Sequence, residues 1–85
     1  MAKYSVFILP SAQKEIEKLP KLAQTKVFKA LVALSENPRP ANCKKLVGTE
    51  AWRVRIGEYR IVYIIEDNIL RVEVVRVAHR KEVYK

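Results

Sequence analysis

The sequence predicts an α+β domain with the element order β-α-α-β-β-β, in which two helices pack on one face of a mainly antiparallel sheet. Apolar residues recur with helical spacing between residues 12 and 34, whereas from Trp52 onward they alternate with polar ones, as in strands. Apolar residues make up 49% of the 85 residues, enough for one core and too many for a disordered tail. We therefore expect residues 1–85 to form a single domain.

One strand and a first helix are expected at the N-terminus. Residues 4–9 are rich in β-branched and aromatic side chains and end at Pro10, which predicts a strand. Ser11 is a candidate N-cap for the helix that follows. Pro20 breaks that helix and can lie in the opening turn of the next one.

The second helix has a clear buried stripe and a clear end. Asn37 precedes Pro38, and a residue before proline avoids the helical conformation, so the helix is expected to end there. Residues 38–51, with Gly48 and two prolines, predict a loop. The stripe has the spacing i, i+3, i+4, i+7 and consists of Val27, Ala30, Leu31 and Leu34.

Three strands are expected after the loop. Gly57-Glu58 is a two-residue connection that suits a tight hairpin between residues 52–56 and residues 59–66. The second of these strands is the most apolar, so we place it at the centre of the sheet. Asp67-Asn68 predicts another tight turn, which leads into a last long strand over residues 69–78.

Arginine is concentrated in the part of the chain from Trp52 onward, where six of its seven arginines lie. The net charge of +8 indicates a polyanionic or an acidic protein partner. In the first hairpin Ile56 opposes Tyr59, so Arg55 is expected opposite Arg60. Like charges across a sheet are unfavourable unless an anion lies between them. Neutralisation by nearby acids or extension into water is the alternative, but few acids share this region.

Several function classes lack their signatures. The sequence has no Gly-rich phosphate loop, no catalytic carboxylate pair, no Ser/His/Asp set and no Cys/His metal set, so neither a metal nor a cofactor is expected. Cys43 is the only cysteine, which excludes an internal disulfide and is compatible with a reducing compartment. We find no signal peptide and no apolar run near the roughly 20 residues of a membrane span, so a cytoplasmic protein without membrane contact is expected.

His79, Arg80 and Tyr84 follow the last strand and are candidates for chemistry. His79 is the only histidine of the chain, and imidazole exchanges protons close to neutral pH. A histidine at a strand end or a terminal tyrosine is often structural. Their expected place at the same end of the sheet as the arginines favours a functional role.

Residues 52–63 (WRVRIGEYRIVY) and residues 75–84 (VRVAHRKEVY) resemble the RelE branch of the RelE/ParE toxin superfamily. The likeness extends over nearly the whole chain, including the two helices after the first strand. It implies a RelE-like fold and a toxin of a type II toxin–antitoxin pair that cuts mRNA in the ribosomal A site. It also implies a RelB-like antitoxin as partner and catalysis without metal, by attack of the RNA 2′-hydroxyl, which leaves a 2′,3′-cyclic phosphate.

The resemblance also suggests roles for individual residues. Arg60 and Arg80 would stabilise transition-state charge, because preset donors around a phosphoryl group lower its barrier. His79 and Tyr84 would carry protons. Other members often have lysines at the sites of Arg53 and Arg55, and an arginine cannot act as a base. The residues expected to hold the RNA backbone are Arg53, Arg55 and Lys45.

Two other functions remain open at this point. A ParE-type toxin would share the scaffold and poison DNA gyrase without catalysis. An inactive member would only bind RNA or its antitoxin. The complete set of basic residues with Tyr84 favours the nuclease.

Overall fold

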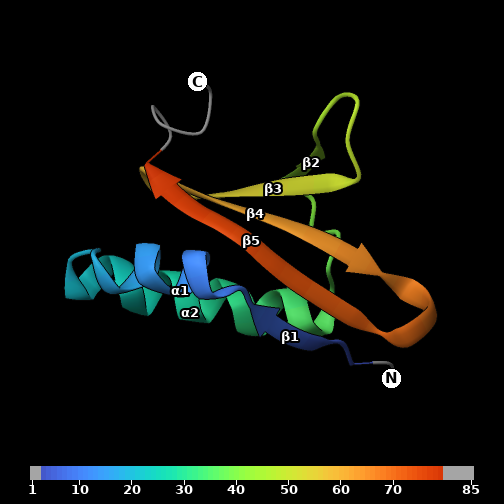
Figure 1. Ribbon diagram of the computed structural model, residues 1–85, viewed down its shortest axis with the longest axis horizontal. Helices are drawn as coiled ribbons and strands as arrows, with labels where there is room; N and C mark the ends of the chain where they lie inside the picture. The colour runs from blue at the N-terminus through green and yellow to red at the C-terminus, as the bar shows by residue number, and fades with distance from the viewer. Residues whose placement is uncertain (1–2, 80–85) are drawn as a thin grey trace.

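The computed structural model of the protein describes residues 3–79 and shows two helices packed against one five-stranded sheet (Figure 1). The predicted α+β class and the order of its elements are confirmed, with one additional short strand. The elements are β1 (Ser5–Ile8), α1 (Pro10–Glu17), α2 (Lys21–Glu36), β2 (Cys43–Lys45), β3 (Ala51–Ile56), β4 (Tyr59–Glu66), the 3₁₀ turn η1 (Asp67–Ile69) and β5 (Arg71–His79).

The strands are ordered β1-β5-β4-β3-β2 across the sheet. β1 runs parallel to β5, and all other neighbours are antiparallel. As expected, the apolar strand β4 is central. The prediction of a loop over residues 38–51 was wrong for β2, because this three-residue strand is too short and too polar to show a periodic pattern.

The helix boundaries follow the prolines. α1 begins at Pro10 and is flanked by Leu9, so the prediction that Ser11 caps this helix was wrong. The fixed φ of proline suits the first helical position, where its missing N–H is not needed. α2 is flanked by Pro20 and Asn37, as expected.

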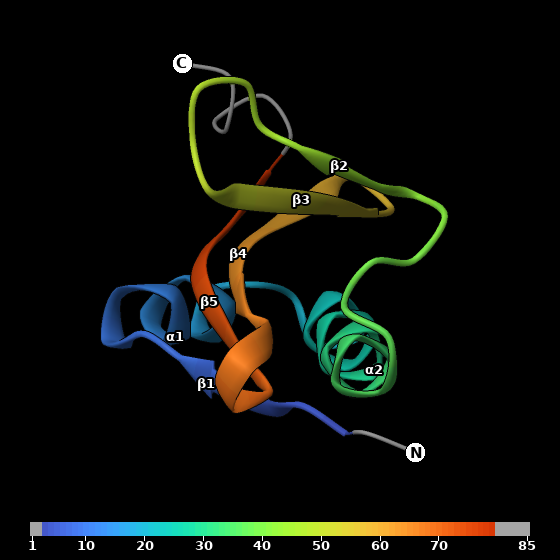
Figure 2. The same ribbon diagram turned by 90° about the vertical axis from the view of Figure 1, so that its right-hand side faces the viewer.

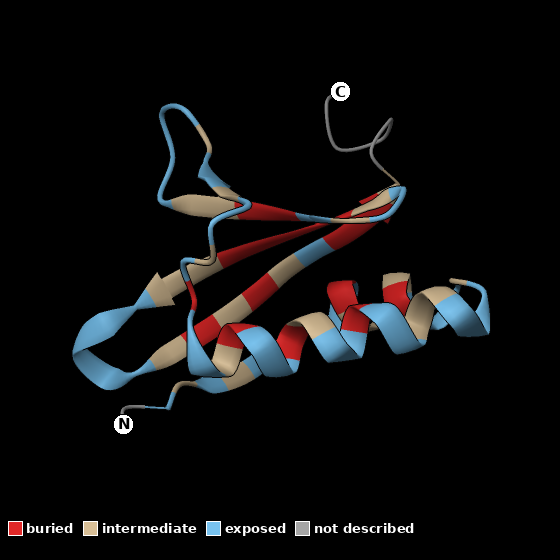
Figure 3. Cartoon of the chain, turned by 180° about the vertical axis from the view of Figure 1, so that it is seen from behind, coloured by how far each residue is buried: buried red, intermediate tan, exposed pale blue. Residues whose placement is uncertain are grey.

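The core lies between the helices and one face of the sheet (Figures 2 and 3). We call this side of the sheet the helix face. Alternate residues of the strands form it, with one shift at a β-bulge in β5, and Ile61, Tyr63 and Val77 are among its buried members. The remaining residues of β3, β4 and β5 point to the opposite side, which we call the open face. The core residues of the helices are Ala12, Ile16, Val27, Leu31 and Leu34.

The two hairpin turns differ from each other. Gly57 has a φ of 61°, and Ile56 pairs with Tyr59, so the predicted two-residue turn is confirmed. The β4–β5 connection is longer than the predicted turn at Asp67-Asn68, because it contains η1. It ends at Leu70, a non-glycine residue with a φ of 51°.

Within residues 3–79 no helix is long and apolar enough to cross a membrane.

Candidate nucleic-acid interface

The β3–β4 hairpin places Arg55 directly opposite Arg60 on the open face. This is the register that the two-residue turn predicts. Both residues alternate with core residues, since Val54 and Ile61 point into the helix face. Opposed side chains of an antiparallel pair lie about 4.5–5.5 Å apart at Cβ, so two positive charges are held close together here.

A second cationic pair lies beside the first one. β2 pairs with β3 so that Lys44 opposes Arg53, on the same face as Arg55. Lys45, which the sequence analysis selected, instead opposes Trp52, whose side chain packs against the core. Lys44 is therefore the lysine that joins the arginines. The face on which Lys44 lies depends on the register of β2, and no pattern in the sequence predicts that register.

Each pair combines a buried cation with an exposed one. Arg60 is only 2% exposed and Arg53 only 9%, whereas Arg55 and Lys44 are exposed. Arginine keeps its charge when buried, so Arg60 and Arg53 bring positive charge beneath the surface of the open face. A direct hydrogen bond from Arg60 to a ligand would require this side chain to become more exposed.

A shallow hollow of about 380 Å³ lies over the second pair. Three cationic side chains from two strands meet at this one depression, and the first residue of β2 with the two residues before it forms the remaining wall. An open, positively charged hollow suits a phosphate group better than an apolar ligand. Its lining residues are Ala41, Asn42, Cys43, Lys44, Arg53 and Arg55.

Acidic residues neutralise arginine at the other end of the open face. Guanidinium nitrogens of Arg71 lie 3.0 Å from a carboxylate oxygen of Glu73 and 3.7 Å from one of Glu66. The guanidinium carbon lies 4.3 Å from the ring centre of Phe7. Within residues 3–79, in contrast, no carboxylate forms an ion pair with Lys44, Arg53 or Arg55. The positive charge of this face is therefore concentrated around β2 and the β3–β4 turn.

His79 does not share this surface. It opposes Tyr59 in the β4–β5 ladder, whereas Arg60 opposes Ala78, so the histidine lies on the helix face and Arg60 on the open face. Its ring meets that of Tyr59 edge to face, with centres 5.7 Å apart. Together with Lys18 the two rings line a different hollow of about 420 Å³. His79 thus lies at the same end of the sheet as Arg55 and Arg60, as expected, but on the opposite face.

Arg80 and Tyr84, the other predicted site residues, lie outside the described residues. Among residues 3–79 there is no group of three side chains suited to hold a metal ion.

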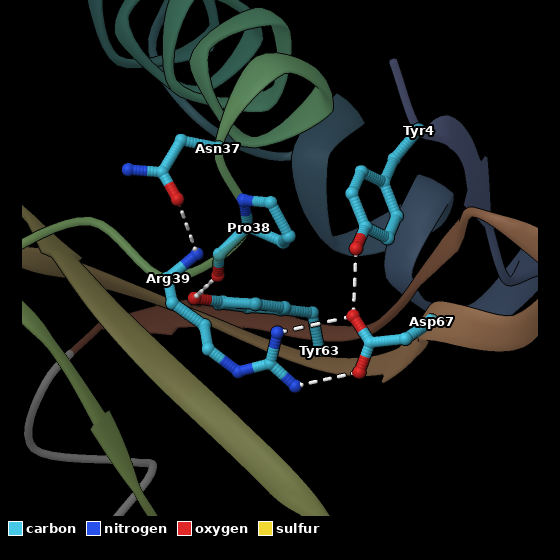
Figure 4. Close-up of polar contacts among 6 residues, drawn as sticks. All are labelled: Tyr4, Asn37, Pro38, Arg39, Tyr63 and Asp67. Atoms are coloured by element: carbon cyan, nitrogen blue, oxygen red, sulfur yellow. Dashed lines mark hydrogen bonds and ion pairs between the residues drawn. The ribbon is translucent and has the colours of Figure 1, made fainter. Parts of the chain in front are cut away.

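A polar cluster fixes the loop that leads into β2 (Figure 4). Arg39 binds both carboxylate oxygens of Asp67, at 3.1 and 2.8 Å, and its guanidinium lies 5.2 Å from the ring centre of Trp52. Tyr4 donates a hydrogen bond of 2.6 Å to the same carboxylate. The hydrogen bonds from Arg39 and Tyr4 lower the pKa of Asp67 to about 2.

A second hydrogen bond holds the start of the same loop. The buried Tyr63 donates a 2.8 Å hydrogen bond to the Pro38 carbonyl, and burial raises the pKa of the Tyr63 hydroxyl.

The chain matches the family model of the ParE toxin of the type II toxin–antitoxin system parDE over residues 6–84. It is also 33% identical over 90 residues to a protein of Methanocaldococcus jannaschii described as "Putative toxin RelE1". That match covers 98% of this chain and 97% of the relative.

Solved structures of RelE proteins share the fold. RelE in the RelBE2 complex of Mycobacterium tuberculosis has a TM-score of 0.82 at 31% identity, covering 92% of this chain and 99% of the other. RelE in the RelE–RelB complex of Pyrococcus horikoshii has a TM-score of 0.83 at 26% identity, with coverages of 94% and 97%. The isolated RelE toxin of E. coli has a TM-score of 0.79 at 31% identity, with coverages of 95% and 90%.

Proposed function

Because the chain belongs to the RelE/ParE superfamily of toxins from type II toxin–antitoxin systems, we propose that it is an endoribonuclease that cuts mRNA in the ribosomal A site and is inhibited by a RelB-like antitoxin. Several of the similar structures are complexes of a RelE toxin with its RelB antitoxin, which supports an antitoxin as partner. The single observation that favours RNA cleavage is the cluster of opposed cations on the open face.

The proposed reaction needs only the RNA and protein side chains. The 2′ oxygen forms a bond to the adjacent phosphorus, and the bond between phosphorus and the 5′ oxygen breaks. The 2′-hydroxyl loses its proton and the leaving 5′ oxygen gains one, so the products are a 2′,3′-cyclic phosphate and a 5′-hydroxyl. Negative charge grows on the phosphoryl oxygens during attack, and cations fixed around them lower the barrier.

Individual roles follow from position and chemistry. Arg55 is exposed and is assigned to hold the RNA backbone together with Arg53, while Arg60 and Arg80 are assigned to the transition-state charge. Lys44 takes the place that the sequence analysis gave to Lys45, because it shares the open face. Tyr84 and His79 are the candidate proton carriers, and the location of His79 on the helix face favours Tyr84 of these two.

A ParE-type toxin that poisons DNA gyrase is the second candidate, because the matching family model describes a ParE toxin. The two functions differ in what they damage in the cell. Expression of the chain in bacteria, followed by mapping of mRNA 5′ ends and of DNA breaks, separates them. The nuclease predicts new mRNA ends in phase with codons, whereas gyrase-linked DNA breaks without new mRNA ends would support the gyrase poison. If neither new mRNA ends nor DNA breaks are found, the remaining interpretation is an inactive protein that only binds RNA or its antitoxin.

A variant pair tests the assigned surface. We expect Arg55→Ala to reduce mRNA cutting about 10- to 100-fold, because a charge-assisted hydrogen bond is worth about 1.5–3 kcal/mol. The matched control is Arg71→Ala, which removes an arginine at the opposite end of the same face, where acids already neutralise it. Equal cutting by both variants, at equal protein levels, would remove the open face from the proposed site.

A further inference from the structure

We propose that Lys44 and Arg53 form a second phosphate subsite, which holds the phosphate next to the one that is cut. The inference rests on the proposed function, because it concerns the same RNA substrate. It adds a residue, Lys44, that one reacting phosphate at the Arg55–Arg60 pair does not require.

The spacing of the two cationic pairs carries the proposal. Arg53 and Arg55 are separated by one residue of β3, so the pairs lie about 6.6–6.8 Å apart along the strand. Neighbouring phosphates of one nucleic-acid strand can occupy positions with such a separation. Each pair opposes like charges across the ladder, an arrangement that is unfavourable without an anion. The Lys44–Arg53 pair therefore favours an anion of its own, beside the phosphate that Arg55 is proposed to hold.

The Lys44–Arg53 pair is accessible to a second anion. Both side chains line the hollow of about 380 Å³, together with Arg55. Lys44 is exposed, so it can contact a phosphate directly, while Arg53 contributes charge from below with an exposure of 9%. A fixed arginine beneath a mobile lysine combines a directed donor with an adaptable one.

Charge balance supports an external anion. Arg39, Arg71 and Arg76 each have a carboxylate within 4.0 Å, supplied by Asp67, by Glu66 and Glu73, and by Glu15 respectively. No carboxylate among residues 3–79 serves Lys44 or Arg53 in this way. Their counter-charge is then expected from a ligand, and in the proposed function that ligand is RNA.

Lys44 and Lys45 provide a matched pair for the test. They are consecutive, equally charged and both exposed, but only Lys44 opposes Arg53 on the open face. The probe is a short single-stranded RNA that carries 2′-O-methyl groups throughout, so that it cannot be cut. Its affinity for the wild type, Lys44→Ala and Lys45→Ala is measured over a series of salt concentrations, with thermal unfolding as a control for folding.

We expect Lys44→Ala to lower the slope of log affinity against log salt by about 0.7, the value for one lost phosphate contact on a single strand. Lys45→Ala should change the slope clearly less. A neutral methylphosphonate, moved along the probe one linkage at a time, then locates the subsite. At one position it should weaken wild-type binding, and Lys44→Ala should weaken it no further.

Three results would overturn the proposal. Equal effects of Lys44→Ala and Lys45→Ala would refute the subsite, and so would a methylphosphonate effect that is independent of its position. Loss of antitoxin binding by Lys44→Ala without loss of RNA binding would assign the pair to the protein partner instead. If mRNA is still cut in cells while one of these results is found, the proposed function stands and only the second subsite falls. If the wild type neither binds the probe nor cuts mRNA, both fall.

Discussion

Asp67 shows how a single exposed carboxylate connects three separate segments of the chain. It accepts hydrogen bonds from Arg39, in the loop before β2, and from Tyr4, just before β1, while it lies itself in the β4–β5 connection. Both donors prefer the ionised carboxylate, which is why the pKa of Asp67 is held well below its usual value. The cluster therefore links the loop that positions Lys44 to the rest of the sheet.

This arrangement predicts a stability that depends on pH. The pKa of Asp67 is about 2 in the folded protein and about 4 in an unfolded chain, so its contribution is fully present above pH 4 and is lost as the pH falls toward 2. We expect Asp67→Asn to lower the melting temperature at neutral pH and to match the wild type near pH 2. Thermal unfolding at a series of pH values measures the difference.

The control for this prediction is Glu50→Gln, which removes an exposed carboxylate that has no ion pair within residues 3–79. Its melting temperature should follow that of the wild type at all pH values. A constant difference between Asp67→Asn and the wild type down to pH 2 would contradict the assigned cause.

The hydrogen bond of Tyr63 gives a second prediction about stability. Its side chain is fully buried, and its hydroxyl donates to the carbonyl of the buried Pro38. Tyr63→Phe keeps the ring but leaves that carbonyl without its donor, so we expect the free energy of unfolding to fall by about 1–3 kcal/mol. Denaturant unfolding measures the loss. A change smaller than 0.5 kcal/mol would mean that another donor, such as water, replaces the hydroxyl.

At the scale of elements, α1 completes the sheet where β1 ends. β1 pairs with β5 only as far as Val74, so the last part of β5 has an open edge. There Glu15 of α1 accepts a 2.8 Å hydrogen bond from the backbone N–H of Val77, and its other carboxylate oxygen binds Arg76. A side chain thus takes the place of a missing strand and fixes the helix against the sheet.

We therefore expect Glu15→Ala to destabilise the fold by about 1–3 kcal/mol, because it leaves the partly buried N–H of Val77 without an acceptor. Glu15→Gln keeps an oxygen at the same position and loses only the charge of an exposed ion pair, so its effect should stay below about 1 kcal/mol. Chemical denaturation of the three proteins gives the comparison. Equal stability of Glu15→Ala and Glu15→Gln would show that the Val77 hydrogen bond contributes nothing.

The elements also show what local sequence could predict. The β3–β4 hairpin was predicted correctly to the register, because Gly57-Glu58 permits few turn geometries and the flanking residues alternate strictly. β2 was missed because this short strand is defined by its pairing with β3, and the loop before it is held by the Arg39–Asp67 contact, which joins residues 28 positions apart. No local pattern contains such a contact. The cap of α1 was misplaced because Ser11 suits the cap position and Pro10 suits the first turn equally well.

At the scale of the whole molecule, the sheet separates two surfaces of different character. The helix face is covered by the helices and forms the core. On the open face, the charge of Arg71 at one end is neutralised by acids, whereas positive charge is concentrated near the β3–β4 turn. The sequence predicted the cation cluster because alternation assigns Arg53, Arg55 and Arg60 to one face. The sequence favoured Lys45, and Lys44 was not considered, because only the register of β2 shows which of the two lysines shares the face of the arginines. The end of the sheet at which His79 lies was expected, but its face was not, because the β-bulge between β4 and β5 shifts the alternation along β5.

In the proposed function, this positively charged face helps the RNA 2′-hydroxyl to attack its own phosphate. The most direct measurement is the chemistry of the mRNA ends that the wild-type protein produces on translating ribosomes. We predict a 5′-hydroxyl on the downstream fragment, which a kinase can phosphorylate, and a 2′,3′-cyclic phosphate on the upstream fragment. A 5′-phosphate on the downstream fragment would show that water or another external nucleophile attacks instead, and would rule out the proposed reaction.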